Sequence, residues 1–76
     1  MPKLPVVKAR EIVRVLRNLG FVLSNQVGSH AQFKDVSGRR VTVPMHAGKD
    51  IGKKTIKGIL DDLELSIDKF VGLLKK

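Results

Sequence analysis

The fold is decided by one stretch of sequence, SHAQFKDVSGRRVTV, which spans residues 29–43. Apolar and polar side chains alternate on both sides of Gly38, as they do in half-buried β-strands. The alternation predicts one strand over Ser29–Asp35 and a second strand over Arg40–Val43. Directly opposed residues of a hairpin share one face of the sheet, so only a loop of odd length pairs Phe33 with Val41.

The loop Val36-Ser37-Gly38 meets this requirement, because a three-residue hairpin loop takes glycine at its left-handed third position. With this loop, Ala31 and Val43 face the core beside the pair Phe33 and Val41. A slip of one residue would bury the charged side chains of the stretch and expose its apolar ones, so the register is well specified. The opposite face is then polar and basic, and it carries His30, Gln32, Lys34, Arg40, Thr42 and Pro44.

Helices and one further strand are expected around this hairpin. A helix over Lys8–Leu19 has an apolar arc and ends at Gly20, which suits a left-handed C-terminal position. A strand follows over Phe21–Gln26, a second helix spans Gly52–Leu63, and Ser66 supplies the N-cap of a last helix. The apolar arc of the first helix comprises Ala9, Ile12, Val13, Val15, Leu16 and Leu19.

The expected fold class is α+β, with a three-stranded antiparallel sheet, helices on one of its faces and the order α-β-β-β-α-α. We interpret the 76 residues, 1–76, as a single domain. The absence of cysteine excludes a disulfide scaffold and a Cys-based zinc site. No apolar run approaches the ~20 residues that cross a bilayer, and no signal peptide is recognised at the start. A cytoplasmic protein without a membrane partner is therefore expected.

The net charge of +8 and the isoelectric point of about 10.3 indicate a polyanionic partner. Nucleic acid is the first candidate, an anionic membrane surface the second and an acidic protein the third. A charged surface that only meets solvent is the remaining alternative. Lys53, Lys54 and Lys57 at the start of the second helix oppose the helix dipole, and a bound anion would relieve that conflict.

Two histidines, His30 and His46, are the side chains that titrate near neutrality without tuning. A neutral imidazole at His30 can take the proton of a ribose 2′-hydroxyl, which then attacks the adjacent phosphate. Nearby lysine or arginine stabilises the developing charge, and the chemistry needs neither a metal ion nor another cofactor. The alternatives are a strand-end histidine satisfied by hydrogen bonds at His30 and a loop histidine that only contacts solvent or phosphate at His46.

Two kinds of site are not expected. The two histidines alone do not make a zinc site, because zinc takes at least three protein ligands. The aromatic residues are Phe21, Phe33 and Phe70, and all three are assigned to the core. Stacking on splayed single-stranded bases is therefore not expected. Contact with the backbone and shape of the nucleic acid is favoured instead, as in double-stranded RNA-binding domains.

Four elements together resemble the HicA family of mRNA interferase toxins. They are Leu16-x-x-Leu19-Gly20-Phe21, Gly28-Ser29-His30, Val43-Pro44-x-His46 and Thr55-Ile56-x-x-Ile59-Leu60. The resemblance implies a double-stranded-RNA-binding-domain-like fold, cleavage of mRNA without the ribosome, and a cognate HicB-type antitoxin that covers the active site. It also implies that the catalytic histidine of the family falls on His30, its turn on Gly28 and Ser29, and a second, less uniform histidine on His46.

With this resemblance, the sequence predicts a toxin of a type II toxin–antitoxin system that acts as a metal-independent mRNA endoribonuclease and blocks translation. His30 is the predicted general base. The residues expected to contact RNA are Gly28, Ser29, Lys34, Arg40, His46 and Lys53. Two alternatives stay open: a non-catalytic RNA-binding module with the same basic surface, and an interaction protein whose basic face docks an acidic partner.

Overall fold

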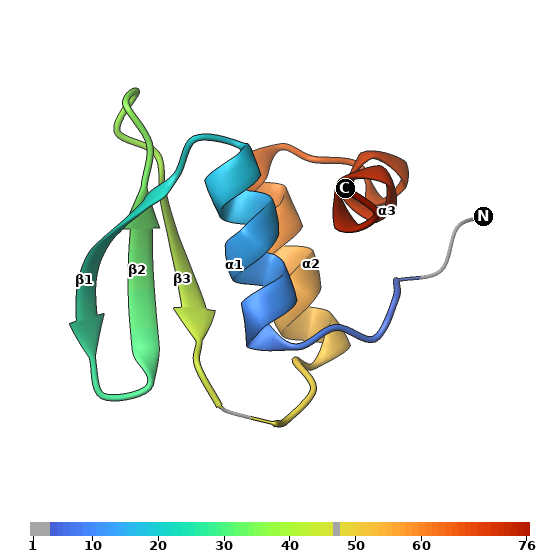
Figure 1. The fold of residues 1–76 in the computed structure, drawn as a ribbon, viewed down its shortest axis with the longest axis horizontal. Helices are drawn as coiled ribbons and strands as arrows, with labels where there is room; N and C mark the ends of the chain where they lie inside the picture. Colours follow the sequence, from blue (N-terminus) through green and yellow to red (C-terminus); the bar gives the residue numbers. More distant parts are fainter. Residues whose placement is uncertain (1–3, 47) are drawn as a thin grey trace.

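One antiparallel sheet carries all three helices on one of its faces (Figure 1). We describe residues 4–46 and 48–76 of a computed structural model. The strand order in the sheet is β1-β2-β3. This confirms the expected α+β class and is consistent with a double-stranded-RNA-binding-domain-like fold. The elements are α1 (Ala9–Asn18), β1 (Val22–Val27), β2 (His30–Lys34), β3 (Arg40–Pro44), α2 (Lys53–Leu63) and α3 (Ile67–Leu74).

The β2–β3 hairpin has the predicted register. Phe33 lies opposite Val41, and Ala31 lies opposite Val43. Gly38 takes the left-handed conformation, with φ of +90°, that the third position of the loop requires. All four apolar residues of the two pairs are buried, so the alternation in residues 29–43 does place one face of the hairpin in the core.

The Asp35 carboxylate organises the loop between these strands. It accepts hydrogen bonds from the backbone N–H groups of Ser37 (3.1 Å) and Arg39 (2.9 Å) and pairs with the Arg39 guanidinium at 3.0 Å. Burial on its own raises the pKa of Asp35, but the hydrogen bonds from Ser37 and Arg39 outweigh it, so the pKa lies below the ordinary 3.8. The Arg39 side chain also lies over the Phe21 ring, 5.6 Å from its centroid.

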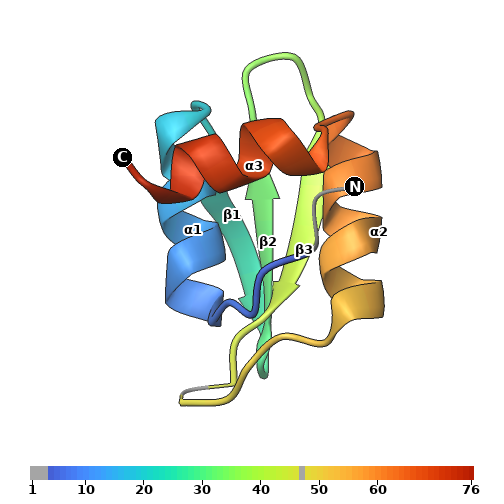
Figure 2. The same ribbon diagram turned by 90° about the vertical axis from the view of Figure 1, so that its right-hand side faces the viewer.

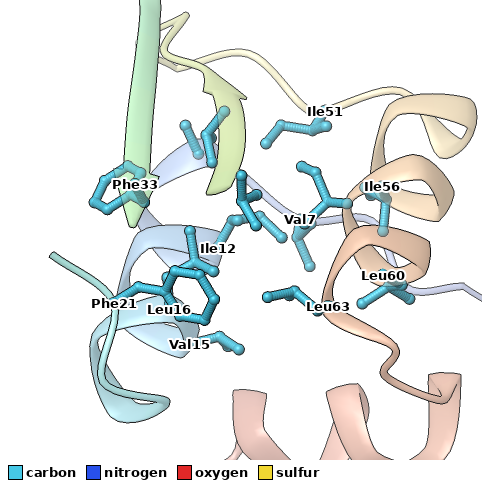
Figure 3. Close-up of a cluster of buried hydrophobic side chains, with 14 of the residues drawn as sticks. Val7, Ile12, Val15, Leu16, Phe21, Phe33, Ile51, Ile56, Leu60 and Leu63 are labelled. Atoms are coloured by element: carbon cyan, nitrogen blue, oxygen red, sulfur yellow. The ribbon is translucent and has the colours of Figure 1, made fainter. Parts of the chain in front are cut away.

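The core lies between the sheet and the helices, as Figure 3 shows. Leu16 of α1, Val43 of β3 and Ile56 of α2 have no exposed surface. The segment before α1 contributes Val7, whose carbonyl accepts a hydrogen bond of 2.9 Å from the N–H of Ile51. This contact ties the start of the chain to the loop that precedes α2.

The ends of the helices follow the expected residues with one exception. Ser66 caps α3 by accepting a hydrogen bond of 3.2 Å from the N–H of Lys69. Lys8 precedes α1 without a side-chain cap, and the Glu11 carboxylate accepts from its N–H at 3.2 Å. Leu19 belongs to the apolar arc expected for the first helix, but it is 36% exposed, because it lies just past the end of α1.

The strand β1 forms one edge of the sheet and lies outside the cover of the helices (Figures 1 and 2). All six of its residues are exposed, including Val22, Leu23 and Val27. The pairing with β2 shifts register between Leu23 and Asn25. This bulge leaves an extra residue in the edge strand and bends it locally.

The two longer helices run in the same direction along the sheet, with α1 on the left and α2 on the right in Figure 2, and α3 crosses them on the side away from the sheet. Both α1 and α2 begin at the same end of the molecule, which is the lower end in Figure 1. None of the helices in residues 4–46 and 48–76 is long and apolar enough to cross a membrane.

The register of the hairpin predicts how one substitution in the core and one in the loop change the stability of the protein. Phe33→Ala removes a side chain that is 3% exposed, so it should lower the free energy of unfolding by about 3–5 kcal/mol. Val36→Ala removes a fully exposed side chain from the loop and should change the free energy of unfolding by no more than about 0.5 kcal/mol. Urea unfolding monitored by circular dichroism measures both, and equal losses would contradict the register.

Candidate functional site

The candidate site lies on the outer face, which we define as the sheet face opposite the helices. The pairing of the strands arranges its residues in three rows that cross the sheet. The lower row holds His30, the middle row holds Gln32, and the upper row holds Lys34. Along β2, each row is about 7 Å from the next, since a strand rises about 3.3 Å per residue. The rows are Val27–His30–Pro44, Asn25–Gln32–Thr42 and Val22–Lys34–Arg40.

His30 is the first residue of β2 and follows the tight turn Gly28-Ser29. Gly28 has φ of +58°, and Ser29 does not have a positive φ, which is the pattern of a type II′ hairpin turn. The histidine is exposed. Within residues 4–46 and 48–76, none of the side-chain hydrogen bonds or ion pairs involves its imidazole. The ring is therefore open to a substrate.

Lys34 and Arg40 lie directly opposite each other in the upper row. Like charges at such a position repel, and a bound anion would remove the repulsion. They share the face of His30, as expected, but they stand about 13 Å from it along β2. The pair stands at the other end of β2 from His30 and suits a more distant part of a polyanion.

His46 lies elsewhere at the lower end of the molecule. It lines a cavity of about 370 Å³ together with Lys8, Arg10 and Gly48, at the start of α1. Hydrogen bonds from the Lys8 ammonium to the Gly48 carbonyl (3.2 Å) and to Asp50 (3.4 Å) hold the neighbouring loop there. The structure thus places His30 on the outer face and His46 against the start of α1.

The turn before His30 and the segment that leads to His46 are nevertheless joined. The Ser29 carbonyl accepts a hydrogen bond from the backbone N–H of Met45, which follows β3. This contact fixes the Gly28-Ser29 turn against the end of β3. The backbone of His30 is therefore held between β1 and β3.

Lys53 is the first residue of α2 and is exposed at the same lower end. No acidic residue stands in the first turn of this helix to balance its dipole, and Gly52 provides no side-chain cap. Lys53 therefore adds positive charge where the helix dipole already favours an anion. Both longer helices start at this end, as Figure 1 shows, so Lys8 and Arg10 also bring positive charge to this end of the molecule.

The two neighbouring arginines of the hairpin have different roles. Arg39 is engaged with Asp35, with the Phe21 ring and with the Leu63 carbonyl at 3.3 Å, so it supports the fold. Arg40 lies in a row of the outer face and is exposed. Lys8 and Arg10 were not among the predicted site residues. No local sequence signal identifies them, because they join His46 only through the folded chain.

Other kinds of site find less support in the part of the chain that the structure describes. No group of three or more His, Cys, Asp or Glu side chains there could hold a metal ion. Phe21, Phe33 and Phe70 are each at most 3% exposed, so they offer no stacking surface to bases. What the outer face offers is one free imidazole, a row of uncharged polar groups and a pair of cations.

The chain is similar to a known protein family. A family model described as "HicA toxin of bacterial toxin-antitoxin" matches residues 9–65. The match covers α1, the whole sheet and α2, and it includes the turn before His30 and the loop that carries His46. Among curated proteins, none matches this chain.

The turn before His30 predicts the effect of a glycine substitution. Gly28→Ala should lower the free energy of unfolding by about 1 kcal/mol or more, because φ of +58° strains a residue with a Cβ atom. Gly58 lies in the middle of α2, with open space around the position of a Cβ atom. Gly58→Ala should therefore raise the free energy of unfolding by about 0.5–1 kcal/mol. Thermal unfolding distinguishes the two, and a stabilised Gly28→Ala would contradict the turn geometry.

Proposed function

The chain belongs to the HicA toxin family, whose members are toxins of bacterial toxin–antitoxin systems, and we propose from this membership that it cleaves mRNA and so stops translation. The observation that carries the proposal is the free imidazole of His30 on the outer face. The imidazole follows the Gly28-Ser29 turn and stands beside a row of uncharged polar residues, with a pair of cations at the other end of β2. A polyanion with a hydroxyl beside each phosphate fits this combination of groups.

In the proposed reaction, His30 acts as the general base. Its imidazole takes the proton of a ribose 2′-hydroxyl, and the 2′ oxygen attacks the adjacent phosphorus. The bond from phosphorus to the 5′ oxygen of the next nucleotide breaks, and that oxygen takes a proton from water. The products are a 2′,3′-cyclic phosphate and a 5′-hydroxyl. The protein supplies no covalent nucleophile, and the step requires no metal ion.

The cations of the site would hold the RNA rather than react with it. We assign the upper row, Lys34 and Arg40, to phosphates beyond the cleaved one, because they stand about 13 Å from His30. Lys53 and His46 are assigned to phosphates that pass the lower end of the molecule. Gly28 and Ser29 present their turn to the RNA next to the reacting phosphate. Such contacts release counterions and make binding sensitive to salt.

The toxin family also implies a protein partner. We propose a HicB-type antitoxin that neutralises the toxin by covering the outer face. The net charge of +8 favours a partner that is acidic where it meets this face. Since mRNA is the proposed target, we place the action of the toxin in the cytoplasm.

A non-catalytic RNA-binding module is the second candidate function. One observation favours it: His46, the other histidine of the chain, lines a cavity at the start of α1 and not the row that holds His30. A docking protein for an acidic partner is the third. RNA binding without cleavage by the parent protein would select the second, and partner binding without salt-sensitive RNA affinity would select the third.

The proposed base predicts the behaviour of His30→Ala. Loss of a general base should slow RNA cleavage by roughly 10²–10⁴-fold and abolish growth arrest on expression. His46→Ala should weaken RNA binding with a smaller loss of cleavage rate at saturating RNA. Circular dichroism checks that each variant is folded. A folded His30→Ala that cuts RNA and arrests growth like the parent would refute the proposed base.

The proposed nucleophile predicts the effect of the sugar. An RNA with a single 2′-deoxy nucleotide on the 5′ side of the preferred bond should not be cut there, while bonds elsewhere in the same RNA are cut as before. The products should carry a 2′,3′-cyclic phosphate, and chelation of divalent cations should leave the rate unchanged. Cleavage at the deoxy position would show that water or another nucleophile attacks the phosphorus.

A further inference from the structure

The middle row of the outer face has a chemistry that the proposed reaction does not use. It consists of Asn25, Gln32 and Thr42, which lie side by side on the three strands. Each side chain both donates and accepts hydrogen bonds, and none carries a charge. The row stands between His30 and the cations Lys34 and Arg40, about 7 Å from each along β2.

Gln32 is the centre of this row, because it stands on the middle strand and is flanked on both sides. It is half-buried, and within residues 4–46 and 48–76 its side chain takes part in none of the hydrogen bonds. In the same part of the chain, no buried side-chain polar atom is left without a partner. The Gln32 carboxamide is therefore in contact with solvent and free to bind a ligand.

We propose that Gln32, supported by Asn25 and Thr42, reads the base of a nucleotide next to the cleaved bond and thereby sets the sequence preference of the enzyme. This inference rests on the proposed function, since it takes His30 as the position of the reacting phosphate. An RNA strand that reaches from His30 to Lys34 and Arg40 passes over the middle row. A nucleotide beside the reacting phosphate therefore lies within reach of the Gln32 carboxamide.

The carboxamide suits this reading because it offers an acceptor and two donors in one plane. It matches a base edge on which a donor and an acceptor are adjacent, and single-stranded RNA exposes such edges. The three phenylalanines are buried, so stacking is not available to hold the base. Hydrogen bonds from the middle row are what this face provides for discrimination between bases.

The test is to sequence the cleavage sites in a randomised RNA pool. The parent protein should show a base preference at one position beside the cut. Gln32→Ala should reduce that preference by roughly tenfold, which is typical of one good amide–base pair. Gln32→Glu should shift it toward bases that present an amino donor, because a carboxylate only accepts hydrogen bonds.

The matched control is Gln26→Ala. Gln26 is the same residue type on β1, but it lies opposite Ala31 and therefore on the other face of the sheet. The Gln26 amide donates a hydrogen bond of 3.3 Å to the Gly28 carbonyl, so Gln26→Ala is expected to affect the rate through the turn before His30. It should leave the base preference unchanged. Parent protein without any preference at the nucleotides that flank the cut, or Gln32→Ala with the full preference, would overturn the inference.

A binding experiment separates this inference from the proposed cleavage. RNA retained from the same pool by His30→Ala should be enriched for the preferred base, and the double variant His30→Ala with Gln32→Ala should lose the enrichment. A parent protein that cuts no RNA would overturn the proposed function, while this enrichment would still support base reading by Gln32. Equal enrichment by the single and the double variant would overturn base reading whether or not the parent cuts RNA.

Discussion

The pairing of Phe33 with Val41 is the constraint on which the rest of this structure depends. Side chains alternate between the two faces of a sheet, so this one pair decides the face of every other residue in β2 and β3. It buries the apolar residues under α1 and α2, and it places His30, Gln32, Lys34 and Arg40 outside. The same register therefore determines both which residues pack in the core and which residues make up the candidate site.

The sequence was sufficient for this register because the alternation is strong and the loop is short. A three-residue loop with glycine at its last position leaves little freedom, and Gly38 has the positive φ that the argument requires. The match to residues 9–65 and the α+β fold agree with what the sequence predicted. The assignment of residues 1–76 to one domain, and the roles of the individual site residues, stay predictions.

Other features depend on contacts between distant parts of the chain, which periodicity does not describe. His46 lines its cavity together with Lys8, whose ammonium bonds to Gly48 and Asp50, about 40 residues later in the chain. Leu19 continues the apolar arc of α1 in sequence, but the helix ends before it, and it lines a shallow cavity against α3 with Leu65 and Leu73. The alternation of the sequence shows that His30, Lys34 and Arg40 share one face of the sheet. It does not give the distance between them, which follows from the rise of the strand per residue.

The exposed edge strand has a consequence for the free protein in solution. β1 presents unpaired backbone groups and the apolar side chains of Val22, Leu23 and Val27, and it contains no charged residue of its own to discourage pairing between copies. The bulge and the net charge of +8 oppose such association. Added salt shortens the range of that repulsion without covering the edge strand, so we expect the colloidal stability of the isolated chain to decrease with ionic strength.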